Sequence, residues 1–276
     1  MTLDAILDVV AAAAPEIRAG LPGRRTKTDA TNETGDRQLA ADVWADELLA
    51  ERFTTVEGVG TYASEEREDA LDVGEGLLVA VDPLDGSSNL RSNNPMGTIV
   101  GVYDDQLPTT GRSLVASAFV LYGPITTMTV AREDTVTEYV LEDGDRRSVG
   151  EVELPADPTI YGMGGRVPDW PPAVAEYVDA VEAELKLRYG GAMIADVNQV
   201  LTYGGVFGYP MLEGSPAGKL RALFEGAPVA HIVETAGGAS SDGERSLLDV
   251  DIEAVHQRTP VFVGNASLVD RLEATV

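Results

Sequence analysis

Hydrophobic and polar positions near the start of the chain repeat with the period of a helix. Apolar side chains recur at positions such as Leu3, Ile6 and Ile17, which predicts an amphipathic helix over residues 2–19. The polar stretch at residues 24–36 is expected to be a loop. Apolar positions return at helical spacing directly after it, which predicts a second helix.

The next part of the chain consists of apolar or alternating stretches of strand length. They predict strands over Gly76–Val81, Met96–Tyr103, Ser113–Leu121, Ile125–Arg132 and Thr135–Leu141. Acidic turn residues and prolines then mark a domain boundary near 150–157. This pattern predicts an N-terminal α+β half over residues 1–155.

Beyond that boundary, strand and helix are expected to alternate, as in an α/β half over residues 156–276. The expected segments are Thr159–Met163, a helix over Pro172–Lys186, Asp196–Leu201, Val206–Pro210, a helix from Gly218 that Pro228 should interrupt, Val261–Gly264 and a last helix over Ala266–Ala274. A chain of 276 residues, of which 44% are hydrophobic, can bury a substantial core.

Composition excludes several classes of chemistry. The chain has no cysteine, so it forms no disulfides and has no thiolate nucleophile. Its two histidines, His231 and His256, lack motif partners and are expected to be structural. No apolar run reaches the roughly 20 residues of a membrane span, and the N-terminus lacks a basic signal region, so a cytoplasmic location is expected.

The net charge of −26 is the most unusual feature of the composition. The carboxylates are spread along the whole chain, and the only lysines are Lys27, Lys186 and Lys219. Self-repulsion of this size is screened by concentrated salt, so the composition is typical of a halophilic protein in a salt-rich cytoplasm. An acidic surface also argues against nucleic-acid binding.

The loop after the Gly76–Val81 strand carries the clearest candidate chemistry. Asp82 and Asp85 stand three positions apart where the strand opens, and Gly86, Ser87 and Ser88 follow them. Carboxylate oxygens suit Mg²⁺ or Mn²⁺, and a glycine–serine turn exposes amides that can hold a phosphate. Short turns of this composition usually carry no chemistry. The full string behind a buried strand nevertheless indicates a metal-assisted phosphatase site.

Two further acidic positions are candidates for the same site. Glu65 and Glu66 are adjacent like charges, which either share a cation or form solvated surface. Glu225 follows Phe224 in an apolar, helix-like stretch, where burial would require a cation or a hydrogen-bond partner.

These strings resemble the fructose-1,6-bisphosphatases of the lithium-sensitive phosphatase superfamily, which also includes the inositol monophosphatases. The resemblance covers nearly the whole chain, from Thr34-Gly35-Asp36 to Val263-Gly264, and its most diagnostic string is K-L-R-x-L-F-E-x-x-P, which begins at Lys219. It implies a layered α-β-α-β-α fold with the active site between two halves. It also implies Mg²⁺-dependent hydrolysis of the 1-phosphate of fructose 1,6-bisphosphate, a reaction of gluconeogenesis.

Carried over position by position, the resemblance assigns roles to individual residues. It implies metal ligands at Glu65, Asp82, Asp85 and Glu225 and at the Leu84 carbonyl, for two or three Mg²⁺ or possible Mn²⁺ ions. It implies that Asp42 or Glu66 activates water, with Asp36 beside them. It implies substrate contacts at Gly86, Ser87, Ser88, Tyr189, Met193, Tyr209 and Lys219. Arg188 matches a residue supplied across a subunit interface, which implies a homodimer or homotetramer.

The chain departs from the family pattern in two places. The Asn-Glu pair of the loop at residues 161–166 is missing, and Arg166 is the candidate to replace its contact with phosphate. A Lys-Tyr pair that binds AMP in animal members is replaced by Gly76-Leu77, so AMP inhibition is not expected.

Three other functions compete with the one that the resemblance implies. Sedoheptulose-1,7-bisphosphatases share the loop, the K-L-R segment and the string Asp196-Val197-Asn198-Gln199. An inositol-phosphate-type phosphatase would share the loop but usually has a W-D-x-A segment, which this chain lacks. A catalytically silent ion-binding protein on the same fold would have less need of all the metal carboxylates.

Overall fold

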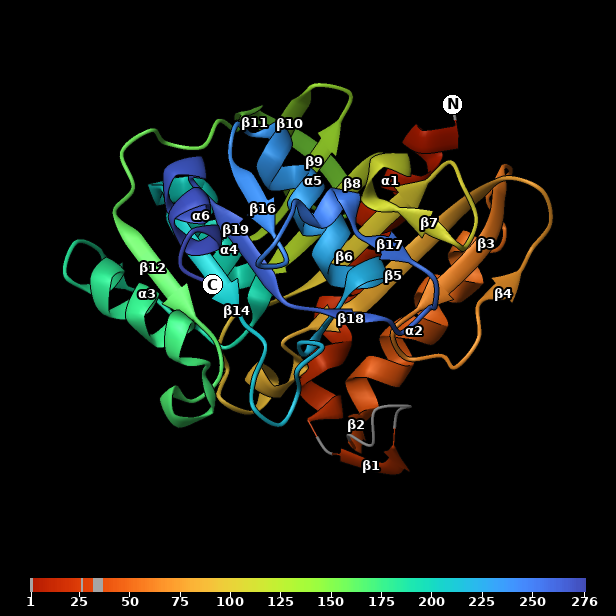
Figure 1. The fold of residues 1–276 in the computed structure, drawn as a ribbon. Coiled ribbons are helices and arrows are strands. Elements are labelled where there is room, and N and C mark those ends of the chain that lie inside the picture. Colours follow the sequence, from red (N-terminus) through yellow and green to blue (C-terminus); the bar gives the residue numbers. More distant parts are fainter. Residues whose placement is uncertain (1, 26, 32–36) are drawn as a thin grey trace.

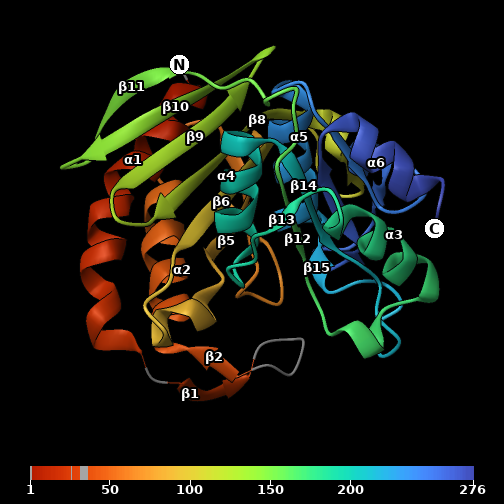
Figure 2. The same cartoon turned by 90° about the vertical axis from the view of Figure 1, so that its left-hand side faces the viewer.

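Five layers of secondary structure make up the molecule. The computed structural model describes residues 2–25, 27–31 and 37–276. A pair of helices, a large sheet, a second pair of helices, a small sheet and a third pair of helices are stacked in that order (Figures 1 and 2). The expected layered α-β-α-β-α fold is therefore confirmed.

The large sheet has eight strands in the order β11-β10-β9-β8-β6-β5-β3-β4. Their bounds are β3 Val59–Ser64, β4 Leu71–Asp72, β5 Leu77–Asp85, β6 Met96–Tyr103, β8 Leu114–Tyr122, β9 Thr126–Arg132, β10 Thr135–Glu142 and β11 Asp145–Glu151. Neighbouring strands are antiparallel except β3 and β5, which are parallel.

Helices cover both faces of this sheet, which explains the unbroken apolar run in β5. Val79 and Val81 pack with the helices α1 (Thr2–Gly20) and α2 (Ala40–Phe53). Leu78 and Ala80 face the opposite core, under α4 (Met193–Tyr203) and α5 (Ala227–Thr235). A strand buried on both faces reads as continuously hydrophobic, because neither face contributes solvent-exposed polar positions.

The small sheet has five strands in the order β13-β12-β14-β19-β16. Their bounds are β12 Ile160–Met163, β13 Lys186–Leu187, β14 Gly205–Tyr209, β16 Ala239–Ser241 and β19 Val261–Gly264. The helices α3 (Pro172–Glu182) and α6 (Ala266–Glu273) cover its outer face, and α4 and α5 separate it from the large sheet (Figure 2). Two further sheets are short pairs, β15 (Leu220–Arg221) with β18 (Arg258–Thr259) and β7 (Thr109–Thr110) with β17 (Asp251–Ile252).

The loop expected at residues 24–36 is partly regular structure. A 3₁₀ turn at Leu21–Arg24 is followed by a two-stranded antiparallel hairpin of β1 (Lys27–Thr31) and β2 (Arg37–Leu39). The two strands pair only with each other, so they do not need the apolar alternation by which a strand is recognised in a sequence.

The prediction of a helix that begins at Gly218 is wrong. Residues 220–221 form β15, a π-helical turn follows at Ala222–Gly226, and α5 begins only at Ala227. Pro228 lies in the first turn of α5, where its missing N–H costs nothing, so it starts this helix instead of interrupting one.

Three other segments also differ from what the sequence predicts. The helix expected to reach Lys186 ends at Glu182, because Lys186 and Leu187 pair with β12 as strand β13. Strand β11 was not expected, because six of its seven residues are exposed and it has no apolar face. The segment at Asp196–Leu201 lies inside helix α4.

The division into halves at 155/156 stays a prediction. The large sheet uses residues before 152 and the small sheet uses residues after 159, but one core cluster, from Ala63 to Val263, contains side chains of both. Within the described part of the chain, no helix is long and apolar enough to cross a membrane.

Candidate active site

The end of β5 brings both aspartates of the loop to one cavity. Asp82 pairs with Ile99 of β6 and Asp85 with Gly97, so β5 carries one extra residue between them. Residues three apart in a regular strand face opposite sides, and the extra residue of a bulge returns both side chains to the same side. Both carboxylates line a cavity of about 370 Å³.

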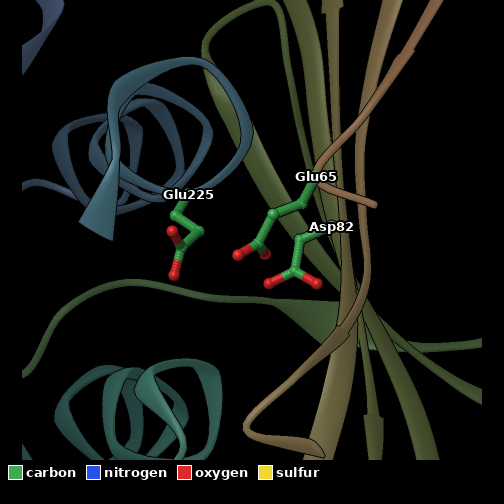
Figure 3. A group of neighbouring side chains, drawn as sticks. All are labelled: Glu65, Asp82 and Glu225. Atoms are coloured by element: carbon green, nitrogen blue, oxygen red, sulfur yellow. The ribbon is translucent and has the colours of Figure 1, made fainter. Parts of the chain in front are cut away.

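Three carboxylates meet at the centre of this cavity. Glu65 directly follows β3, Asp82 lies in β5, and Glu225 comes from the π-helical turn across the cavity (Figure 3). One oxygen from each lies within 4.8 Å of the others. Burial, and then the charge of Glu65, raises the pKa of Asp82 and of Glu225 well above the usual carboxyl range. Ionising these three carboxylates together costs free energy unless a cation lies between them, and carboxylate oxygens are the ligands that Mg²⁺ prefers.

Two contacts hold this cluster in place. The backbone N–H of Arg221 donates to Glu225 Oε2 at 2.7 Å, which fixes the carboxylate against its own turn. The Arg221 guanidinium lies 3.0 Å from Glu65 and partly neutralises the cluster. Glu225 is 3% exposed, so it is buried among its apolar neighbours, and the Arg221 N–H is a hydrogen-bond partner of the kind that such burial requires.

Asp85 lines the same cavity but stands apart from the trio. Its Oδ2 accepts the backbone N–H of Ile194, at 2.7 Å, in the first turn of α4. Burial raises the pKa of Asp85 to about 7, and the Ile194 N–H opposes that rise. The free N–H groups at the start of a helix stabilise a carboxylate. Asp85 therefore supports α4 as well as facing the cavity.

Asp42 and Glu66 also line this cavity. Asp42 Oδ2 accepts the Leu39 backbone N–H at 2.9 Å and the Ser87 hydroxyl at 3.3 Å, whereas its buried Oδ1 has no hydrogen-bond partner among the described residues. Burial is the main cause that raises the pKa of Asp42 to about 6. Asp36 lies outside the described residues.

The expected substrate contacts lie around the same cavity. Its lining includes Leu84, Gly86, Ser87, Ser88, Tyr189, Met193, Tyr209 and Lys219. Gly86 has φ of +71°, a left-handed conformation that favours glycine, and the 3₁₀ turn Ser87–Arg91 follows it. Also in the lining, the Lys219 ammonium lies 5.4 Å from the centre of the Tyr209 ring.

Two arginines lie elsewhere. Arg188 does not line the cavity; its guanidinium donates to Gln199 at 3.3 Å and lies over the Tyr203 ring. Arg166 does not line it either, because its exposed side chain pairs with Asp169 at 2.8 Å. Replacement of the missing Asn-Glu contacts by Arg166 therefore finds no support in this arrangement.

Comparison with known proteins decides the family. A model described as the N-terminal domain of fructose-1,6-bisphosphatase matches residues 2–152, and one described as its C-terminal domain matches residues 154–276. The chain belongs to the fructose-1,6-bisphosphatase family.

Relatives within this family include class 1 fructose-1,6-bisphosphatases of halophilic archaea. The chain is 62% identical to that of Halobacterium salinarum, with 99% of this chain and 97% of the relative covered. It is 61% identical to that of Natronomonas pharaonis, with 99% and 98% covered.

Solved structures show the same fold. Fructose-1,6-bisphosphatase from Leishmania major in holo form superposes with a TM-score of 0.94 at 28% identity, over 99% of this chain and 94% of that one. A putative sedoheptulose-1,7 bisphosphatase from Toxoplasma gondii superposes with a TM-score of 0.90 at 31% identity, over 99% and 94%.

The structure adds two residues to the site that the sequence had not assigned. Arg221, inside the family string that begins at Lys219, pairs with Glu65. Arg91 lines the cavity at the end of the turn that carries Ser87 and Ser88. Both arginines lie in or next to strings that the sequence analysis singled out, but only the fold shows that their side chains reach the cavity. His231 and His256 bond to Ser117 and to the Arg67 carbonyl and do not line the cavity.

Proposed function

We propose that this chain hydrolyses the 1-phosphate of fructose 1,6-bisphosphate to give fructose 6-phosphate and inorganic phosphate. Membership of the family and the convergence of Glu65, Asp82 and Glu225 beside a glycine–serine cradle support this proposal. A sugar bisphosphate carries two anions, and Lys219 adds a cation to the lining of the cavity that also holds the carboxylates.

Magnesium is the proposed cofactor, with two or three ions per site and Mn²⁺ as the alternative. The carboxylates of Glu65, Asp82, Asp85 and Glu225 and the Leu84 carbonyl would hold it. When bound there, the metal supplies a water of lowered pKa and neutralises charge that develops on phosphorus and on the leaving oxygen.

The remaining steps fall to residues of the chain. The amides and hydroxyls of Gly86, Ser87 and Ser88 cradle the phosphate that is cleaved. Asp42 is the proposed acceptor of the water proton, because it lines the cavity, its Oδ1 has no hydrogen-bond partner among the described residues and burial raises its pKa to about 6. As the water oxygen bonds to phosphorus, the bond from phosphorus to the sugar O1 breaks, and O1 leaves with the bonding electron pair and takes a proton from solvent to become the hydroxyl of fructose 6-phosphate. Lys219, Tyr189 and Tyr209 hold the second phosphate and the sugar.

Release of inorganic phosphate from fructose 1,6-bisphosphate in molar KCl tests this proposal. Mg²⁺ should be required, and EDTA should abolish turnover. Asp82→Asn should also abolish it, whereas Asp72→Asn, on the exposed edge strand β4, serves as the matched control. Equal rates in Mg²⁺ and in EDTA would overturn the proposed mechanism.

Sedoheptulose 1,7-bisphosphate is the second candidate substrate. The likeness to the putative sedoheptulose-1,7 bisphosphatase and the string that begins at Asp196 favour including it. The ratio of kcat/KM for the two bisphosphates decides between them.

Assembly into a homodimer or homotetramer is proposed for the surface around Arg188. Arg188 does not line its own cavity, and the large apolar side chains Leu187 and Tyr203 beside it are 62% and 49% exposed. Light scattering should show at least a dimer in molar KCl, and an active monomer there would contradict the proposal. The acidic composition fits a salt-rich cytoplasm, which is the proposed location.

A further inference from the structure

Two neighbouring loops that line the cavity are hydrogen-bonded to each other, although 101 positions separate the bonded residues in sequence. One is the cradle, residues 86–91, and the other is residues 189–192, here called the sugar loop. A side chain on Gly86 would place its Cβ 2.1 Å from the Ala192 Cβ, so the two backbones are in direct contact. Just before the cradle, Asp85 accepts the N–H of Ile194, just after the sugar loop.

Asn89 forms the central link between the loops. Its side chain is buried, and its Nδ2 donates to the Gly190 carbonyl and to the Pro95 carbonyl, both at 2.9 Å. A primary amide has two donors, so both are used in one fixed orientation. Backbone bonds from Asn89 N to Gly86 O and from Asn94 N to Asn89 O hold the cradle side of the link.

Asp196 holds the sugar loop from the other side. The Gly190 N–H donates to Asp196 Oδ1 at 2.7 Å, and the Gly191 N–H also bonds to this carboxylate. Gln199 Nε2 reaches the same oxygen at 3.4 Å. Gly190 is therefore held at its carbonyl by Asn89 and at its N–H by Asp196. Asp196 and Gln199 belong to the string at residues 196–199, for which the proposed function gives no role.

The contacts of Asn89 and Asp196 with Gly190, here called the clamp, join the cradle to the sugar loop. Ser87 and Ser88 lie on its cradle side, and Tyr189 lies on its sugar-loop side; all three line the cavity. We infer that Asn89 and Asp196 are positioning residues that set the distance between the phosphate cradle and Tyr189, a proposed contact of the second phosphate, and so select a sugar bisphosphate over a monophosphate. This inference rests on the proposed function.

A pair of variants tests the clamp. Asn89→Leu keeps the volume of the side chain and removes both donors, and Asn198→Leu, on helix α4, is the matched control, because the Asn198 side chain makes no hydrogen bond within the described structure. The substrates are fructose 1,6-bisphosphate and fructose 1-phosphate, which has no second phosphate. Asn89→Leu should lower kcat/KM for the bisphosphate at least about tenfold, since displacement of about 1 Å can cost as much as a hundredfold.

The selectivity of the loss distinguishes a clamp from a structural role. In Asn89→Leu, the loss of kcat/KM for the bisphosphate should come mainly from a higher KM. The value of kcat/KM for fructose 1-phosphate should change less than about twofold. Asp196→Asn, which keeps the shape of the side chain, should cause the same selective loss at smaller size, and it tests the clamp should Asn89→Leu not fold. An equal loss on both substrates, or no loss on either, overturns the inference. A wild-type protein without preference for the bisphosphate would instead overturn the proposed substrate.

Discussion

The guanidinium of Arg221 lies 3.0 Å from the Glu65 carboxylate, with side-chain exposures of 7% and 14%. Arg221 therefore places one buried positive charge against a cluster of carboxylates. Because such a charge offsets repulsion among its neighbours, its removal should leave uncompensated negative charge in the interior.

Arg221→Gln should destabilise the protein by about 3–5 kcal/mol without metal, and Mg²⁺ should restore part of the loss by supplying positive charge to the same cluster. Thermal melts in molar KCl, with EDTA or with Mg²⁺, measure both effects. Arg112→Gln is the control, because Arg112 pairs with Asp249 at an exposed site and should cost less than about 1 kcal/mol. An equal loss with and without Mg²⁺ would argue against this role for Arg221.

Stability of the metal-free protein should fall as pH rises from about 4 to about 7. Burial raises the folded-state pKa of Asp42 to about 6 and of Asp85 to about 7, whereas both groups return to the ordinary carboxyl range when the chain unfolds. Within that window the native state holds protons that the unfolded chain has released, so raising the pH favours unfolding.

Binding of Mg²⁺ should follow the opposite pH trend, because carboxylates must release their protons to bind a metal. The melting-temperature gain from Mg²⁺ should be larger near about pH 8 than near about pH 5. Melts across that range in molar KCl, with EDTA or Mg²⁺, check both trends, and Asp42→Asn should flatten part of the metal-free slope. A metal-free melting temperature that climbs steadily over the range would refute the prediction.

Lys219→Ala should raise KM for fructose 1,6-bisphosphate with little change in kcat. Lys219 lies beside Tyr209 in the lining of the cavity, and as the proposed contact of the second phosphate, which does not react, it should bind equally in the ground state and the transition state. Steady-state kinetics measure the change, and Lys186→Ala, at an exposed position in β13, is the matched control. Identical kinetics on fructose 1-phosphate and the bisphosphate in the wild type would remove the case for this contact.

Thermal stability should rise with KCl into the molar range. The net charge is −26, and the Debye length is about 3 Å at 1 M salt, so exposed carboxylates stop repelling one another. Screening alone should saturate near about 1 M, whereas weak cation binding should stabilise the protein further. Melts in a KCl series, with sucrose as a non-ionic control, separate these effects. A melting temperature that is flat or falls from dilute buffer to molar KCl would contradict the halophilic interpretation.

The sequence by itself determined those features that depend on local pattern. Strand β5 is predicted by a continuous apolar run, because both of its faces are buried, and helix α1 by apolar residues at helical spacing, because one of its faces is buried. The loop from Asp82 to Ser88 was recognisable because its residue types are suited to cations and phosphate. The halophilic interpretation rests on net charge and composition, which are properties of the sequence and do not depend on the fold.

Tertiary structure decided what depends on contacts between distant segments. Hairpin β1–β2 and strand β11 are polar in sequence, and six of the seven residues of β11 are exposed, so no apolar period predicts them. The helix expected at Gly218 is a strand and a π-helical turn, which together bring Glu225 to the carboxylates of Glu65 and Asp82. The direction in which Arg188 points and the bond from Asn89 to Gly190 likewise depend on which backbones pack together, and spacing along one chain does not specify that packing.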